Sequence, residues 1–116
     1  MALAAGGGAH QNGHVAAGIE AAGGRSLSVH ADITDAGDIQ VMVEKVVDRF
    51  GSLDILVNNA GRRIVKPFLE HTEEEWRQML DLNLTGHFLC CKAGVPHMLK
   101  AGGGRIVNVA SIAGLV

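Results

Sequence analysis

The chain has 116 residues, with 10 Lys and Arg, 12 Asp and Glu, and a formal charge of -2 at pH 7. This length allows one small domain, and the charge argues against nucleic acid or an anionic membrane as a partner. Hydrophobic residues make up 47% of the chain and charged residues 19%, which excludes an intrinsically disordered protein. No apolar run is long enough to span a membrane.

The cysteines and histidines indicate neither disulfides nor a metal site. Cys90 and Cys91 are adjacent and there is no secretory signal, so we expect a reducing, cytoplasmic compartment. The six His are scattered without the spacing of metal ligands, so no metal is expected. We interpret these isolated His and the Cys pair as surface or packing residues.

The first third of the chain begins with a Gly-rich segment. Residues 1–14 have no hydrophobic period and are typical of a flexible arm, which leaves residues 15–116 as the folded domain. Residues 15–23 resemble the end of a helix that stops at two glycines. Residues 26–31 alternate apolar and polar positions and predict a short strand.

The segment after Asp35 predicts an amphipathic helix. Thr34 or Asp35 can cap its first turn, and Gly51 can end it. Its apolar side chains recur every three or four residues, which is the period of a helix with one buried stripe. These side chains are Ile39, Met42, Val43, Val46, Val47 and Phe50.

Two further strands flank a long helix in the second half. Residues 53–57 are apolar on both faces, which favours a parallel sheet covered on both sides. Thr72 and Glu75 have capping-box spacing at the start of a helix that extends to about Lys100. Residues 105–110 predict another buried strand. The side chains expected on the buried side of the helix are Trp76, Met79, Leu80, Leu84 and Phe88.

The order strand, helix, strand, helix, strand predicts right-handed crossovers and a parallel α/β sheet. Ligands of such sheets bind outside the carboxyl ends of the strands. Asp32 follows the first predicted strand, Asn58 to Gly61 follow the second, and Ser111 follows the third. Each could simply start a turn, cap a loop or cap a helix. Their occurrence after all three strands favours a binding site.

Asn83 lies on the apolar stripe of the long helix. A buried amide that finds no partner costs about 1–3 kcal/mol, so its side chain needs hydrogen bonds. One interpretation is a core Asn that the backbone satisfies. The other is that Asn83 distorts the helix and leaves polar groups facing a pocket.

Four segments together resemble the short-chain dehydrogenases/reductases, of the 3-oxoacyl-carrier-protein reductase-like type. They are AAGGRSLSVHADITD, FGSLDILVNNAG, EEEWRQMLDLNLTGHF and GGRIVNVASIAG, and they cover about residues 15–116. The resemblance implies a partial Rossmann-like, doubly wound parallel sheet of three strands and two crossover helices. These strands would match the third, fourth and fifth of the order 3-2-1-4-5-6, without the first βαβ unit and the C-terminal part.

The resemblance also implies a cofactor, NAD or NADP. Asp32 and Ile33 match the pair that contacts the adenine ring. Asn59, Ala60 and Gly61 match the loop that supports the sheet and lies along the cofactor ribose.

The implied reaction is hydride transfer between the nicotinamide and a small-molecule alcohol or ketone. Ser111 matches the catalytic Ser that hydrogen-bonds the substrate oxygen. Asn83 matches the helix Asn whose carbonyl holds a water of the proton relay. A Tyr would act as general acid/base, with a nearby Lys lowering its pKa.

Several parts of the family pattern are missing. The chain contains no Tyr, so the Y-x-x-x-K motif has no counterpart. Gly6 to Gly8 and Gly13 lack the spacing of the family's phosphate loop and are interpreted as linker. We therefore expect part of a longer enzyme that is inactive alone. Without the first and second strands, two strand edges of the chain lack partners, which predicts marginal stability or aggregation. Oligomers are expected only in a full-length form.

Two other functions are compatible with the sequence. The first is a non-catalytic nucleotide-binding or interaction module derived from the same fold; Ser111 and Asn83 argue against it, because a binder does not need them. The second is a flavodoxin-like domain that binds a phosphate ligand. The lack of a phosphate-type loop counts against that domain.

Overall fold

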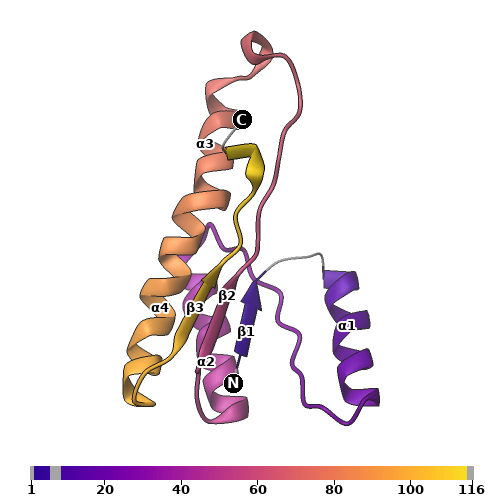
Figure 1. The fold of residues 1–116 in the computed structure, drawn as a ribbon, viewed down its shortest axis with the longest axis vertical. Coiled ribbons are helices and arrows are strands. Elements are labelled where there is room, and N and C mark those ends of the chain that lie inside the picture. The colour runs from indigo at the N-terminus through magenta and orange to yellow at the C-terminus, as the bar shows by residue number, and fades with distance from the viewer. Residues whose placement is uncertain (1, 6–8, 115–116) are drawn as a thin grey trace.

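In the computed structural model, residues 2–5 and 9–114 are described, and their centre is a three-stranded parallel sheet (Figure 1). Strand β1 (Ala2–Ala5) pairs with β2 (Ile55–Asn58), and β2 pairs with β3 (Arg105–Asn108). The strand order is therefore β1-β2-β3, so β1 and β3, from opposite ends of the chain, both pair with the central strand β2.

The helices fall into two groups. Helix α1 (Ala9–Ala21) stands apart from the sheet, whereas α2 (Ala36–Phe50) packs against it (Figure 1). Helix α3 (Glu73–Leu80), a π turn (Asp81–Thr85) and α4 (Gly86–Lys100) follow one another as one long helical segment. Short 3-10 turns occupy Phe68–Glu70 and Ile112–Gly114.

The expectation of an arm without regular structure over residues 1–14 is wrong for the part described. Ala2–Ala5 form β1, and α1 begins at Ala9, so the sheet starts before residue 15. The reason is that β2 lies in the middle of the sheet and its buried backbone needs a partner on each edge. Ala2–Ala5 supply one of these partners through main-chain hydrogen bonds. The glycines at 6–8 lie outside the described residues.

The strand expected over residues 26–31 does not form. Val29 and Ala31 still pack against the core, as the alternating pattern suggests. However, no described strand pairs with this segment, since the sheet of the described residues consists of β1, β2 and β3. A strand needs such a neighbour, so the segment stays irregular.

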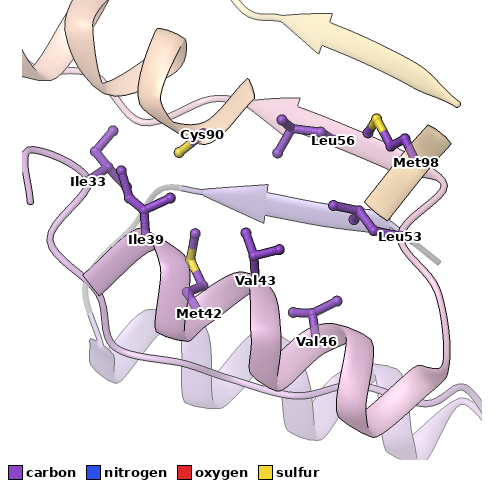
Figure 2. Packing of buried hydrophobic residues seen from close by; sticks show 9 residues of the cluster. All are labelled: Ile33, Ile39, Met42, Val43, Val46, Leu53, Leu56, Cys90 and Met98. Atoms are coloured by element: carbon purple, nitrogen blue, oxygen red, sulfur yellow. The ribbon is translucent and has the colours of Figure 1, made fainter. Parts of the chain in front are cut away.

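Helix α2 supplies four of the nine core residues and confirms its predicted pattern. The Asp38 amide donates to Asp35 Oδ1 at 3.0 Å, and Gly51 ends the helix with a φ of 89°. A positive φ at this position suits glycine. The buried side of α2 faces the sheet and α4 (Figure 2). The core residues are Ile33, Ile39, Met42, Val43, Val46, Leu53, Leu56, Cys90 and Met98.

The buried face predicted for the long helix is wrong. Trp76, Leu84 and Phe88 are 58%, 65% and 61% exposed. The buried residues of α4 are instead Gly86, Cys90, Gly94 and Met98, which recur every four positions. The small ones allow a close approach to the sheet: a Cβ on Gly94 would lie 3.1 Å from a Leu53 methyl group. The close approach of α4 to the sheet therefore determines which side of the helix is buried, because large apolar side chains do not fit at its glycine positions.

The opposite face of the sheet is open in the described part of the chain. Ile55 is 40% exposed and Val107 is 48% exposed, so neither the buried strand expected over residues 105–110 nor a sheet covered on both sides is observed. Exposed apolar surface of this extent favours association. The marginal stability expected of the isolated chain stays a prediction, and this face supports it.

Candidate functional site

An open cleft of about 760 Å³ lies where β2 and β3 end. One side of it is the loop that follows β2, another is the segment that follows β3, and the third is the helical segment around the π turn. The polar side chains that line it include Asn59, Arg63, Asn83, His87, Asn108 and Ser111. The position matches the carboxyl ends of the parallel strands, as the sequence predicts.

The loop after β2 is held to the π turn by Asn83. The Arg62 amide donates to Asn83 Oδ1 at 2.8 Å, and Asn83 Nδ2 donates to the Arg62 carbonyl at 2.8 Å. A Cβ on Gly61 would lie 3.0 Å from Asn83 Oδ1, so glycine leaves room for this contact. Both main-chain groups of Arg62 are therefore paired with one side chain, which defines the course of the loop along the cleft.

Asn83 differs from its prediction in one respect and agrees in another. It is exposed, not buried on an apolar stripe, because the helix turns a different face to the core. The helix is distorted at this residue, as the second interpretation requires: the Gly86 amide bonds to the carbonyl of Asp81, five residues earlier. Such π turns often occur at functional sites.

Ser111 lines the cleft in the segment that follows β3. Its Oγ accepts a hydrogen bond from the Ala113 amide at 3.1 Å, so it also caps the short turn that follows. This bond uses only the acceptor side of the hydroxyl, and its hydrogen remains available to a ligand. The capping role and a role in binding are therefore compatible.

Asp32 lies beside the main cleft, in an adjoining cavity of about 250 Å³ that shares Arg62 and Met79 with it. The Thr34 hydroxyl donates to Asp32 Oδ1 at 2.7 Å, and the Thr34 amide donates to the same atom at 2.9 Å. These bonds hold the pKa of Asp32 below its ordinary value, chiefly through the hydroxyl. Asp32 is thus a carboxylate at neutral pH.

Ile33 takes a different position from the other predicted site residues. Its side chain is 6% exposed and belongs to the core, where a Cβ on Gly86 would lie 2.8 Å from its Cδ1. Only its backbone can face a ligand. The structure therefore gathers the Asn59–Gly61 loop, Asn83 and Ser111 at one cleft, with Asp32 at its side.

The sequence prediction missed His87. Its Nε2 lies 2.9 Å from the Ala60 carbonyl, and because a carbonyl only accepts, the proton is on Nε2. This hydrogen bond holds the loop at a second point, in addition to the hydrogen bonds between Asn83 and Arg62. The signal was available: His87 follows Asn83 by four residues and so shares its face of a helix.

Asn58 belongs to the polar segment expected at the site, but it is the last residue of β2 and is not among the residues that line the cleft. It is 1% exposed, and its Nδ2 donates to Asn108 Oδ1 at 2.9 Å and to Cys91 Sγ at 3.4 Å. These contacts join the ends of β2 and β3 under the cleft. Its Oδ1 is buried and has no hydrogen-bond partner among the described residues. A buried acceptor of this kind suits a donor from an internal water.

The cysteines behave as packing residues, as expected. Cys90 and Cys91 are free thiols, and burial raises the pKa of Cys90 to about 11, which makes it unreactive. Among the described residues no cluster of His, Cys, Asp or Glu could hold a metal ion. Over the same part of the chain, no helix has the length and apolarity that a membrane crossing needs.

The predicted capping box at the start of α3 is present and also anchors the loop that leaves the cleft. The Glu75 amide donates to Thr72 Oγ1 at 3.1 Å, and the Thr72 amide donates to Glu75 Oε1 at 3.2 Å. Lys66 Nζ lies 2.7 Å from the same carboxylate oxygen. The Lys66 contact, with the Thr72 bonds, lowers the pKa of Glu75 to about 2.

This arrangement predicts a pH-dependent contribution of Glu75 to stability. Because its pKa falls from 4.5 to about 2 on folding, the stabilisation is complete above pH 4.5 and is lost as the pH falls to about 2. Glu75→Gln should thus be less stable than the natural chain at neutral pH, and the difference should shrink over this window. Urea unfolding at a series of pH values measures it. Glu73→Gln, whose carboxylate pairs with Arg77 on the exposed face, is the control. A difference that is constant down to pH 2 would contradict the assignment.

Comparison with known proteins agrees with this geometry. The model of the short chain dehydrogenase family matches residues 2–116. A 3-oxoacyl-[acyl-carrier-protein] reductase of Synechocystis is 41% identical over 102 residues, which are 88% of this chain and 41% of the relative. A trans-4-hydroxycyclohexanecarboxylate dehydrogenase of Sinomonas cyclohexanicum is 48% identical over 91 residues, which are 78% of this chain and 35% of the relative.

A solved structure extends the likeness to the fold. A 7α-hydroxysteroid dehydrogenase in complex with NADH and 7-oxo glycochenodeoxycholic acid superposes with a TM-score of 0.89 at 30% identity. The match covers 99% of this chain and 44% of that one. This confirms the partial Rossmann-like α/β fold, while the chain spans about two fifths of the length of the Synechocystis relative. The chain belongs to the short-chain dehydrogenase family.

Proposed function

We propose that this chain carries the cleft in which an NAD- or NADP-dependent oxidoreductase transfers a hydride to or from a small-molecule alcohol or ketone. The observation that carries the proposal is the gathering of the Asn59–Gly61 loop, Asn83 and Ser111 around one opening at the carboxyl edge of the sheet. Family membership and the NADH in the related 7α-hydroxysteroid dehydrogenase support it.

The residues present fit the adenosine part of a dinucleotide. The cleft volume of about 760 Å³ is within the range of small-molecule sites. Gly61 leaves room for Asn83 Oδ1, which holds the Asn59–Gly61 loop along the cleft. We assign the ribose to the Asn59, Ala60 and Gly61 loop. We assign the adenine to Asp32, whose carboxylate can accept from an amine, and to the backbone of Ile33. When bound, the nicotinamide supplies or accepts the hydride.

Ser111 and Asn83 would act on the substrate side. The free hydrogen of the Ser111 hydroxyl can donate to the substrate oxygen, which stabilises negative charge that develops there. Asn83 holds the loop through Arg62, so its side chain orients the cleft. A water held by the Asn83 carbonyl is a further proposal, and the π turn supports it because bonding five residues apart changes which carbonyls are free.

We also propose that the 116-residue chain does not catalyse the reaction by itself. The family chemistry implied by the resemblance uses a Tyr as general acid/base, and the chain contains none. The same fact favours a second candidate, a non-catalytic module that binds the nucleotide without converting a substrate. The proposal of an oxidoreductase also includes a cytoplasmic location and the formation of oligomers only in a full-length form.

Ligand-observed saturation-transfer NMR at low micromolar protein separates these possibilities. We expect NADH or NADPH to bind, and no oxidation of NADH when a ketone is added. Binding of neither cofactor at millimolar concentration would refute the proposal, and turnover would refute the proposed inactivity. Ketone binding to the NADH-saturated chain that Ser111→Ala weakens supports the oxidoreductase site. Absence of any ketone binding supports the non-catalytic module.

A further inference from the structure

We propose that Arg63, with Arg62 beside it, forms an anion subsite in the cleft, so that the substrate is a ketone or alcohol that carries a carboxylate or a similar negative group. The inference rests on the proposed function, since it specifies the substrate class of the same cleft. Both residues line the cleft together with Ser111, and both are exposed.

The first observation is that these two guanidinium groups have no partner in the part of the chain that the structure describes. Among the described residues, Arg62 and Arg63 make no side-chain hydrogen bond, ion pair or ring contact. Every other arginine does. Arg25 and Arg49 lie over the Phe50 ring, Arg77 pairs with Glu73, and Arg105 donates to the Gly104 carbonyl. Within residues 2–5 and 9–114, the arginines without a partner are thus those at the cleft.

The second observation is the charge of the lining. The described residues around the cleft include two arginines and no Asp or Glu. The nearest acids that share a cavity with Arg62 are Asp32 and Asp81, in the adjoining cavity, and Arg63 does not line that one. The field in the cleft is therefore positive, and it favours an anionic ligand.

The third observation is that the subsite is anchored. Asn83 pairs with both main-chain groups of Arg62, at 2.8 Å each, and His87 bonds the Ala60 carbonyl at 2.9 Å. The arginines therefore project from a backbone that is held before a ligand arrives, which lowers the entropic cost of binding. A planar guanidinium matches a carboxylate through two parallel hydrogen bonds.

The test uses a matched pair of cyclic ketones, 4-oxocyclohexanecarboxylate and its neutral carboxamide, with the full chain and saturation-transfer NMR. We expect the carboxylate to bind roughly tenfold more tightly than the carboxamide at low salt. The preference should decrease as salt screens the charges. Arg63→Gln should abolish most of it and leave the carboxamide affinity unchanged. Arg77→Gln, an exposed arginine of α3, should leave both affinities unchanged.

Parallel titration with NADH keeps the two proposals distinct. NADH binding without a preference for the carboxylate would overturn the subsite alone. A preference that Arg63→Gln abolishes, in a chain that does not bind NADH, would support the subsite and refute the proposed cofactor. Loss of NADH affinity in Arg63→Gln with the carboxylate preference intact would overturn the inference, because the arginine would then serve the cofactor phosphates. Circular dichroism of Arg63→Gln checks that the variant is folded.

Discussion

Leu56→Ala should lower the free energy of unfolding by about 2–5 kcal/mol, enough to unfold much of a small domain. Leu56 is 0% exposed in the centre of β2. Its side chain points to the layer that α2 and α4 form over the sheet (Figure 2). A Cβ on Gly94 would lie 3.6 Å from its Cδ2, so the neighbouring helix is close and the deletion leaves a cavity. Urea unfolding followed by circular dichroism measures the loss.

Ile55→Ala is the matched control for this prediction. Ile55 is the preceding residue of the same strand, and its side chain points to the open face, where it is 40% exposed. It should lose much less stability than Leu56→Ala, because less apolar area leaves the water when it folds. Equal losses at the two positions would contradict a sheet that is covered on one face.

Gly61→Val should weaken NADH binding by about ten- to a hundredfold. A Cβ at this position already lies 3.0 Å from Asn83 Oδ1, and the two methyl groups of valine require more room. The valine therefore separates the loop from Asn83 and breaks the paired hydrogen bonds to Arg62. The loop that forms the cofactor side of the cleft is then displaced, while the hydrophobic core between α2 and the sheet is unchanged. Fluorescence titration of NADH measures the change.

Gly18→Val provides the control for the cleft variant. Gly18 lies on α1, and a Cβ there meets nothing within 4 Å, so the substitution adds the same atoms away from the cleft. NADH affinity should be unchanged in this variant. A similar loss in both variants would mean that the effect comes from general destabilisation, and an unaffected Gly61→Val would exclude the loop from the cofactor site.

Where the local pattern and the packing agree, the sequence predicts the structure well. The stripe of α2, its Asp35 cap and its Gly51 end follow from helix periodicity and capping chemistry, which depend on near neighbours. The Thr72 and Glu75 box is local in the same way. The loop at Asn59 was identifiable because it follows a short apolar strand directly.

The misses come from contacts between distant segments. Ala2–Ala5 have no strand propensity, and only pairing with β2 makes them a strand. Residues 26–31 have the pattern but lack a neighbour. In α4 the close approach at Gly94 decides which face is buried, although Phe88 is more hydrophobic. His87 could have been found from its spacing to Asn83, whereas the Arg62 pairing depends on a loop path that no local rule predicts.

The most direct test of the central claim is a map of amide chemical shifts in the full chain as NADH is added. The account predicts that the largest changes occur at the cleft, in Asn59, Gly61, Asn83 and Ser111, with smaller ones at Asp32. Changes confined to the separate hollow between residues 27–30 and α2, or no changes at millimolar NADH, would contradict it.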